Sequence, residues 1–201
     1  MINLSPSHLQ VAQVMKREGA FVSLITQLKS GHNTTKVTAL CVKALAQYIA
    51  RDEKLRDSII ENSLLHWMEE SSEKLPDEVE LQEEIIYFIY ALLSQRHWPL
   101  MSKVMPGIHT LSKIFIRLSN MFPFEQSKPD DVWKEVKASE CLILILNAFE
   151  NVVKHNHDLF EQLALMNGYH IALMNLVNYG KDLAMVTEAM GIISALCGAK
   201  R

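Results

Sequence analysis

Residues 8–25 read HLQVAQVMKREGAFVSLI, in which one apolar helical pattern ends at Gly19 and a second begins at once. Glycine tolerates the left-handed backbone that ends a helix, so this stretch predicts two short helices joined by a tight turn. Similar joints are centred on Ser63, Gly107 and Gly168, and the four markers are separated by 44, 44 and 61 residues. A spacing in the forties is typical of stacked repeats of two or three helices.

This spacing predicts an all-α protein in which residues 1–201 form a single domain of about four repeats. The period breaks once, because the distance between the last two markers exceeds the others by 17 residues. The stretch 122–131 is rich in residues that stop helices, so we expect an insertion loop there. The repeats are expected at about residues 7–50, 52–95, 97–153 and 155–201.

Apolar residues at helical spacing predict the individual helices inside these repeats. The expected ranges are about 8–17, 20–28, 34–50, 52–61, 63–70, 78–95, 97–105, 107–121, 132–153, 157–165, 168–178 and 181–197. In the helix 34–50, the residues expected to face the core are Val37, Leu40, Cys41, Ala44, Leu45 and Tyr48. The apolar run 142–146 should lie between other helices. The last helix has little polar cover, which indicates a continuing stack or a partner over that end.

The charge of the chain is weakly negative overall and strongly negative in one stretch. A net charge of −3 and a pI near 6.2 do not match the basic composition of a general nucleic-acid binder. Between Glu69 and Glu84 there are eight acidic residues against one basic residue, Lys74. This stretch is either a solvated loop and helix start, where acids suit the positive end of the helix dipole, or a contact for a basic partner.

The insertion loop 122–131 carries two aromatic residues, Phe122 and Phe124. They either clamp the loop onto neighbouring helices or form an exposed apolar contact for a partner. Long insertions in helical repeats lie on one face of the stack and often carry function, so both residues are candidates for partner binding.

Several features indicate a soluble intracellular protein. The first residues lack a positive leader, and the longest apolar run, Ile85 to Leu93, is far shorter than the roughly 20 residues of a membrane span. The three cysteines (Cys41, Cys141 and Cys197) lie in apolar helical contexts without CxxC spacing, as reduced core residues do. We therefore expect a cytoplasmic or cytoskeletal location, with the nucleus left open.

No stretch of the sequence carries the signature of catalysis. It contains no phosphate-binding GxxxxGK[ST] or GxGxxG element, no GxSxG and no HExxH. His155 and His157 are two residues apart, which on a helix directs them away from each other. We therefore expect no enzymatic activity, and we assign no catalytic residue, cofactor or metal ligand.

Residues 8–25 resemble the first helix, glycine joint and second helix of an armadillo repeat. Residues 148–153, followed by 157–164 and Asn167-Gly168, look like the end of one such repeat passing into the next. HEAT repeats have similar helix lengths, but the short first helix and the glycine joint favour the armadillo type. The resemblance implies a right-handed α-solenoid that binds proteins, as do the large repeat scaffolds of centrioles and cilia.

In the armadillo family, the third helices line a concave groove in which an asparagine holds the backbone of an extended peptide. Asn151 matches that asparagine, but the equivalent positions in the other repeats hold other residues. Importin-type members also carry a tryptophan one helical turn before the asparagine, and no repeat of this chain has a tryptophan there. Binding of nuclear-signal peptides is therefore not expected. The residues that the resemblance places on the groove are Lys43, Gln47, Tyr87, Tyr90, Ser94, Asn147, Asn151 and Ser194. Alternatively, the two tyrosines are partly buried core residues.

Two other functions compete with binding of a peptide or helix. The first is an adaptor that recognises nucleic acid through a local basic ridge. Its candidate residues are Lys103, Lys113, Arg117, Lys134 and Lys137. The second is self-association through the terminal repeat. The sequence predicts no membrane partner.

Overall fold

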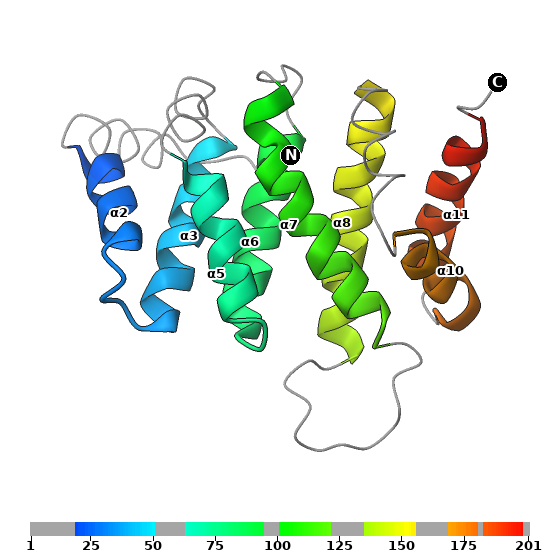
Figure 1. Ribbon diagram of the computed structural model, residues 1–201, viewed down its shortest axis with the longest axis horizontal. Coiled ribbons are helices and arrows are strands. Elements are labelled where there is room, and N and C mark those ends of the chain that lie inside the picture. Colours follow the sequence, from blue (N-terminus) through cyan, green and yellow to red (C-terminus); the bar gives the residue numbers. More distant parts are fainter. Residues whose placement is uncertain are drawn as a thin grey trace, which may run out of the picture.

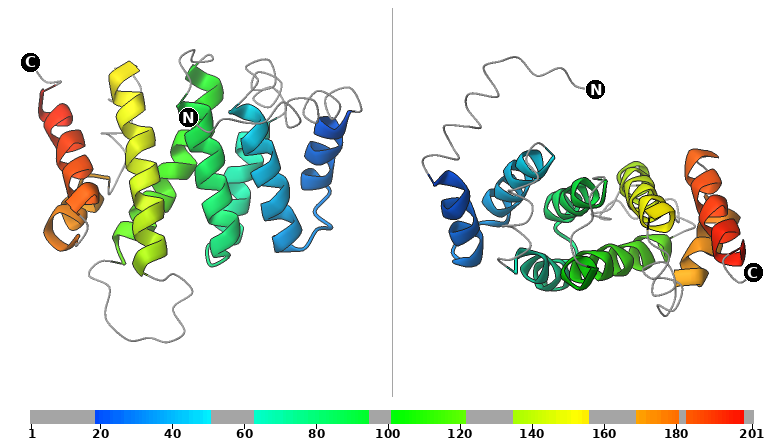
Figure 2. Two further views of the ribbon diagram at one scale, coloured as in Figure 1. Left: turned by 180° about the vertical axis from the view of Figure 1, so that it is seen from behind. Right: turned by 90° about the horizontal axis from the view of Figure 1, so that it is seen from above.

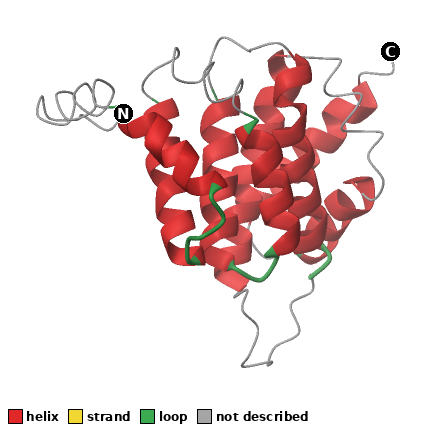
Figure 3. Cartoon of the chain, turned by 60° about the vertical axis from the view of Figure 1, so that its left-hand side comes forward, coloured by secondary structure: helices red, strands yellow, loops and turns green. Residues whose placement is uncertain are grey.

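The computed structural model describes residues 19–50, 63–94, 101–121, 135–155, 169–180 and 183–198. Their regular secondary structure consists of α-helices alone (Figure 3). These ranges contain eight helices: α2 (Ala20–Lys29), α3 (Thr35–Ile49), α5 (Leu64–Lys74), α6 (Val79–Leu93), α7 (Met101–Ser119), α8 (Glu135–His155), α10 (Tyr169–Tyr179) and α11 (Leu183–Gly198). The prediction of an all-α fold is confirmed.

The helices follow one another along the long axis of the molecule in chain order (Figure 1). In one layer, α3 packs on α6, α6 on α8 and α8 on α11, and in the other α5 packs on α7 and α7 on α10. The view from above in Figure 2 shows two rows of helices: α3, α6 and α8 lie in one row, and α5 and α7 lie in the other. Contacts α5–α6, α7–α8 and α10–α11 join the layers. Such sequential pairing is consistent with a helical repeat.

The first two predicted joints have the expected left-handed backbone. Gly19 has φ 68° directly before α2, and Ser63 has φ 55° directly before α5. Within the described part of the chain, Ser63 is the one non-glycine residue with positive φ. Positions 44 residues apart thus share an unusual conformation, as equivalent positions of a repeat should.

The third predicted joint is wrong, because α7 runs unbroken through Pro106 and Gly107. Proline inside a helix removes one backbone hydrogen bond but does not always end the helix. Thr110 Oγ1 donates to the Pro106 carbonyl at 2.7 Å. A Cβ on Gly107 would lie 3.2 Å from the side chain of Ile89 and 3.3 Å from that of Leu65. Glycine at this position therefore allows close packing on α5 and α6 and does not form a turn.

The buried side of α3 also differs from the prediction. Val37 and Leu40, which we expected in the core, are 42% and 57% exposed. The residues that α3 buries are Ala39, Val42, Leu45, Ala46 and Ile49. Apolar residues occupy more than half of the circumference of this helix, so their pattern does not fix its orientation. The two small alanines face inward, and the larger Leu40 remains at the surface.

The expectation that the run 142–146 lies between other helices is confirmed. In α8, Leu142, Ile145 and Leu146 are fully buried, and α8 packs on α6, α7 and α11. An aromatic cluster of Phe115 (α7), Phe149 (α8) and Tyr169 (α10) lies next to it, with ring centroids 5.5–5.7 Å apart. Two of its three contacts are edge-to-face, a favourable geometry for aromatic rings.

The turn between α10 and α11 depends on a glycine. The Gly180 N–H donates to the Leu176 carbonyl at 2.8 Å. A Cβ at position 180 would lie 2.4 Å from that same carbonyl oxygen and 2.9 Å from the Met185 side chain. Backbone atoms of a packed helix cannot move aside, so the turn has no room for a side chain there.

The remaining predicted helices 8–17, 52–61 and 157–165, the joint at Gly168 and the insertion 122–131 lie outside the described residues. None of the described helices is long and apolar enough to cross a membrane.

Candidate functional site

The residues predicted for the groove all belong to the layer of α3, α6, α8 and α11. They come from α3 (Lys43, Gln47), α6 and its C-cap (Tyr87, Tyr90, Ser94), α8 (Asn147, Asn151) and α11 (Ser194). All eight are exposed or half-buried. Phe122 and Phe124 lie outside the described residues. The described candidates therefore reach solvent from neighbouring helices of one layer.

Three of these residues line one pocket. Lys43 and Gln47 from α3, Tyr87 from α6 and Leu144 from α8 surround a shallow cavity of about 220 Å³, together with Glu83 and Glu84. Asn147 follows Leu144 by three residues and Asn151 follows Asn147 by four, so both lie on the same side of α8. The structure thus brings residues more than 90 positions apart in sequence onto one surface.

The tyrosines of α6 give this surface an aromatic centre. Tyr87 is 42% exposed and Tyr90 is half-buried, with ring centroids 6.5 Å apart. Leu40, one helical turn before Lys43 on α3, is another exposed apolar residue. Tyr90 packs against the core, whereas Tyr87 offers contact area to solvent.

Sequence analysis did not anticipate that acidic residues would lie beside these tyrosines. Glu83 and Glu84 precede Tyr87 by four and three residues, a spacing that places them on the same face of α6. Lys43 Nζ donates to Glu84 at 2.8 Å, and Lys137 Nζ donates to Glu83 at 2.6 Å. These hydrogen bonds raise the pKa of both lysines. A row of alternating ion pairs therefore joins α3, α6 and α8.

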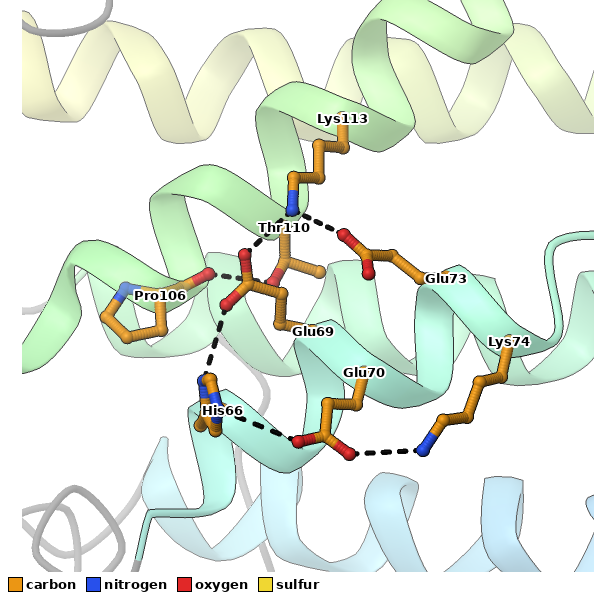
Figure 4. Close-up of polar contacts among 8 residues, drawn as sticks. All are labelled: His66, Glu69, Glu70, Glu73, Lys74, Pro106, Thr110 and Lys113. Carbon is orange, nitrogen blue, oxygen red and sulfur yellow. Dashed lines mark hydrogen bonds and ion pairs between the residues drawn. The ribbon is translucent and has the colours of Figure 1, made fainter.

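A second ion-pair network joins α5 and α7 in the other layer (Figure 4). Lys113 of α7 donates to Glu69 at 2.9 Å and also to Glu73. Hydrogen bonds to Glu73 and then Glu69 raise the pKa of Lys113, and the same contact lowers the pKa of Glu73. His66 lies 3.5 Å from Glu69. The acidic stretch is thus mostly helical, and four of its acids connect neighbouring helices.

The end of α5 and the start of α6 are linked by a buried glutamine. Gln82 accepts hydrogen bonds from Ser72 Oγ at 2.8 Å and from Arg117 at 2.9 Å. Its amide donates to the carbonyls of Ser72 and Leu75 at 3.1 and 2.8 Å. One side chain therefore satisfies polar groups from α5, from the following turn and from α7. A fully buried polar residue of this kind fixes the relative position of the helices.

The residues suggested for a basic ridge are mostly engaged inside the protein. Lys113 and Lys137 form the ion pairs described above. Arg117 is half-buried against Gln82, and burial lowers the pKa of its guanidinium. Lys103 is exposed on α7, whereas Lys134 lies outside the described residues. This arrangement does not favour binding of phosphate groups, which need free cations.

Cys41 and Cys141 are poor nucleophiles. Burial raises the pKa of Cys41, and it raises that of Cys141 to about 12. The thiolate is the reactive form of cysteine, so neither residue is activated. Within the part of the chain that the structure describes, no group of three or more His, Cys, Asp or Glu side chains is arranged to hold a metal ion.

Comparison with known proteins leaves the fold and the pocket as the basis for interpretation. No protein-family model matches this chain, and neither a curated protein nor a solved structure matches it.

Proposed function

We propose that this chain is a non-enzymatic scaffold module that binds a peptide or a helix of a protein partner on the layer formed by α3, α6 and α8. In this proposal the sequential helix pairs form a right-handed α-solenoid of about four armadillo-like repeats. The partner lies across the pocket lined by Lys43, Gln47 and Tyr87 and extends toward Asn147 and Asn151.

The observation that carries the proposal is the pocket shared by α3, α6 and α8. It combines an exposed aromatic ring, Tyr87, with an aliphatic wall, Leu144, and an amide, Gln47. Tyrosine supplies contact area at a low cost in conformational entropy, and amides supply hydrogen bonds to a peptide backbone. A surface that crosses several helices suits an extended partner better than a small substrate.

The cellular setting follows from the same proposal. Long stacks of armadillo-like repeats serve as scaffolds of large assemblies, including those of centrioles and cilia. A module of this kind would act in the cytoplasm or at the cytoskeleton. The buried Cys141 is compatible with a reducing compartment, in which thiols need no partner.

Selection from a displayed library of random peptides would test the proposal, because the partner is unknown. Peptides enriched on the 201-residue chain are measured by fluorescence anisotropy against the wild type and a Tyr87→Ala, Asn151→Ala double variant. We expect the double variant to bind at least about tenfold more weakly, as loss of a contact residue in an interface does.

The matched control is His66→Ala, which removes a side chain 66% exposed on α5 in the opposite layer. It should leave the affinity unchanged. Equal affinity of the wild type and the double variant would contradict the proposed site, and failure to enrich any peptide would contradict peptide binding.

A further inference from the structure

The pocket of α3, α6 and α8 lies inside the row of helices and not at one of its ends. Helix α6 packs on α3 on one side and on α8 on the other, and α2 and α11 follow outward. The volume of the pocket is about 220 Å³. Sites for small molecules have volumes of roughly 300–1,000 Å³, so this pocket suits a single side chain of a protein partner better than a free ligand.

Part of the pocket lining is apolar or uncharged. Tyr87 contributes an aromatic ring and Leu144 an aliphatic side chain, while Gln47 contributes a neutral amide. The methylene groups of Lys43 add apolar surface, because a lysine side chain can keep its ammonium group in water while its stem is covered. Burying apolar surface is favourable, so this part of the lining favours an apolar side chain.

The rest of the lining consists of Glu83 and Glu84, and each of these carboxylates is paired with a lysine. Lys43 Nζ lies 2.8 Å from Glu84, and Lys137 Nζ lies 2.6 Å from Glu83. The lysines come from opposite sides of α6, because Lys43 belongs to α3 and Lys137 to α8. Glu140, which is 3.6 Å from Lys137, is 62% exposed and lies outside the lining. The two positive and two negative charges of these pairs cancel.

The two ion pairs act as one cluster. The hydrogen bond to Glu84 is the main cause of the raised pKa of Lys43, but Glu83 also raises this pKa and Lys137 lowers it. A charged side chain of a partner would disturb the balance, since a cation would approach a lysine and an anion would approach two glutamates. Covering the pocket removes the water that screens such repulsion. An uncharged side chain leaves both ion pairs intact.

We propose that the pocket receives one uncharged, apolar side chain of the partner, and that Lys137 sets this selectivity by neutralising Glu83. The inference rests on the proposed function and adds the chemistry of the residue that is bound. Lys137 lies outside the lining and acts on the partner through Glu83, so it is a positioning residue.

The test uses peptides selected from a displayed random library on the wild-type chain. A double-mutant cycle between each peptide position and Tyr87→Ala identifies the peptide residue that occupies the pocket, because only residues in contact couple strongly. The peptide is then synthesised with leucine, phenylalanine, arginine or glutamate at that position. We expect the leucine or phenylalanine form to bind the wild type at least about tenfold more tightly than either charged form.

The variant Lys137→Met leaves Glu83 without its lysine. The arginine peptide should therefore gain at least about tenfold in affinity relative to the leucine peptide. A merely structural role of Lys137 would weaken all four peptides alike and leave their ratios unchanged.

Three further variants separate charge from structure. Lys137→Arg keeps the positive charge and should keep the wild-type ratios. Glu83→Gln added to Lys137→Met makes the pocket neutral again and should restore the preference for an apolar side chain. Lys74→Met changes the net charge by the same amount on α5, in the opposite layer, and should leave the ratios unchanged.

The outcomes distinguish this inference from the proposed function. A wild-type preference for a charged residue, ratios that do not change in Lys137→Met, or no peptide position coupled to Tyr87 overturns the inference while peptide binding itself stands. Failure to enrich any peptide on the wild type contradicts the proposed function, and this inference with it.

Discussion

At the scale of single residues, Ser63 adopts a backbone conformation that suits glycine. Its φ of 55° lies in the left-handed region, where a Cβ crowds the backbone. Gly19, 44 residues earlier, has nearly the same conformation without that cost. The joint before α5 is therefore held in a strained form by the packing of the helices around it.

Replacement of Ser63 by glycine should stabilise the protein. We expect Ser63→Gly to raise the free energy of unfolding by about 0.5–1 kcal/mol, since relief of left-handed strain exceeds the added flexibility of the unfolded chain. Urea unfolding followed by circular dichroism measures the change. The reverse substitution Gly19→Ala should lower stability by a similar amount, and a Ser63→Gly variant less stable than the wild type would contradict the interpretation.

At the scale of helices, the sequence predicted the bounds of a helix better than which of its sides faces the core. The ranges expected for α2, α3 and α6 differ from the observed bounds by no more than two residues. Thr34 marks the start of α3, where its side chain accepts a hydrogen bond from the Val37 N–H, and Gly19 marks the start of α2. Pro106 was misread, because a proline removes only one backbone hydrogen bond, and α7 continues through it with Gly107 packed closely against Ile89 and Leu65. The orientation of α3 depends on contacts with α6, which local periodicity does not contain.

The ion pairs between α5 and α7 should give stability a defined pH dependence. The folded protein raises the pKa of Lys113 above its ordinary 10.5 and lowers that of Glu73 below its ordinary 4.5. The stabilisation is therefore complete between about pH 5 and 10. It is lost as the pH rises through the raised lysine pKa or falls through the lowered glutamate pKa.

This dependence is measured as the difference in the free energy of unfolding between the wild type and Lys113→Met. Urea unfolding at a series of pH values should give a difference that is constant across the plateau and shrinks on both sides. As a control, Lys74→Met on α5 removes a 72% exposed lysine that pairs with Glu70 of the same helix. A Lys113→Met difference that does not change with pH would show that the ion pairs contribute nothing measurable.

At the scale of the whole molecule, each described helix contacts only helices near it along the row. The cluster of Phe115, Phe149 and Tyr169 is therefore a main link between α10 and the rest. Phe149→Ala should cost about 3–5 kcal/mol, as truncation of a buried aromatic residue does. Hydrogen exchange should show loss of protection in α10 and α11 while α3 and α6 keep theirs.

The control for this experiment is Val136→Ala, which shortens a side chain that is 72% exposed on the same helix as Phe149. It should change neither stability nor the exchange pattern. Uniform loss of protection over all helices in Phe149→Ala would show a single cooperative unit and contradict a row of semi-independent pairs.

The sequence predicted which helices carry the surface proposed for binding, but it did not predict which residues line the pocket on that surface. Spacing and resemblance placed Gln47, Tyr87 and Asn151 on one layer, and the structure brings Gln47 and Tyr87 to one pocket. Leu144 and Glu83 were not recognised, because their roles arise from contacts between helices about 60 residues apart in sequence. Such contacts leave no local signal, apart from the shared helical face of Glu83 and Tyr87.

The lack of space for a side chain at Gly180 predicts the effect of missense variants at this position. Any codon change that alters this amino acid adds at least one carbon atom, and that atom would lie 2.4 Å from a helix carbonyl oxygen. Whatever the new residue is, chemically mild or drastic, the backbone at position 180 must shift away from the last turn of α10, which disturbs the hydrogen bond from its N–H to the Leu176 carbonyl. Missense variants at this codon should thus be similarly damaging, in contrast to codon 191, where space is open.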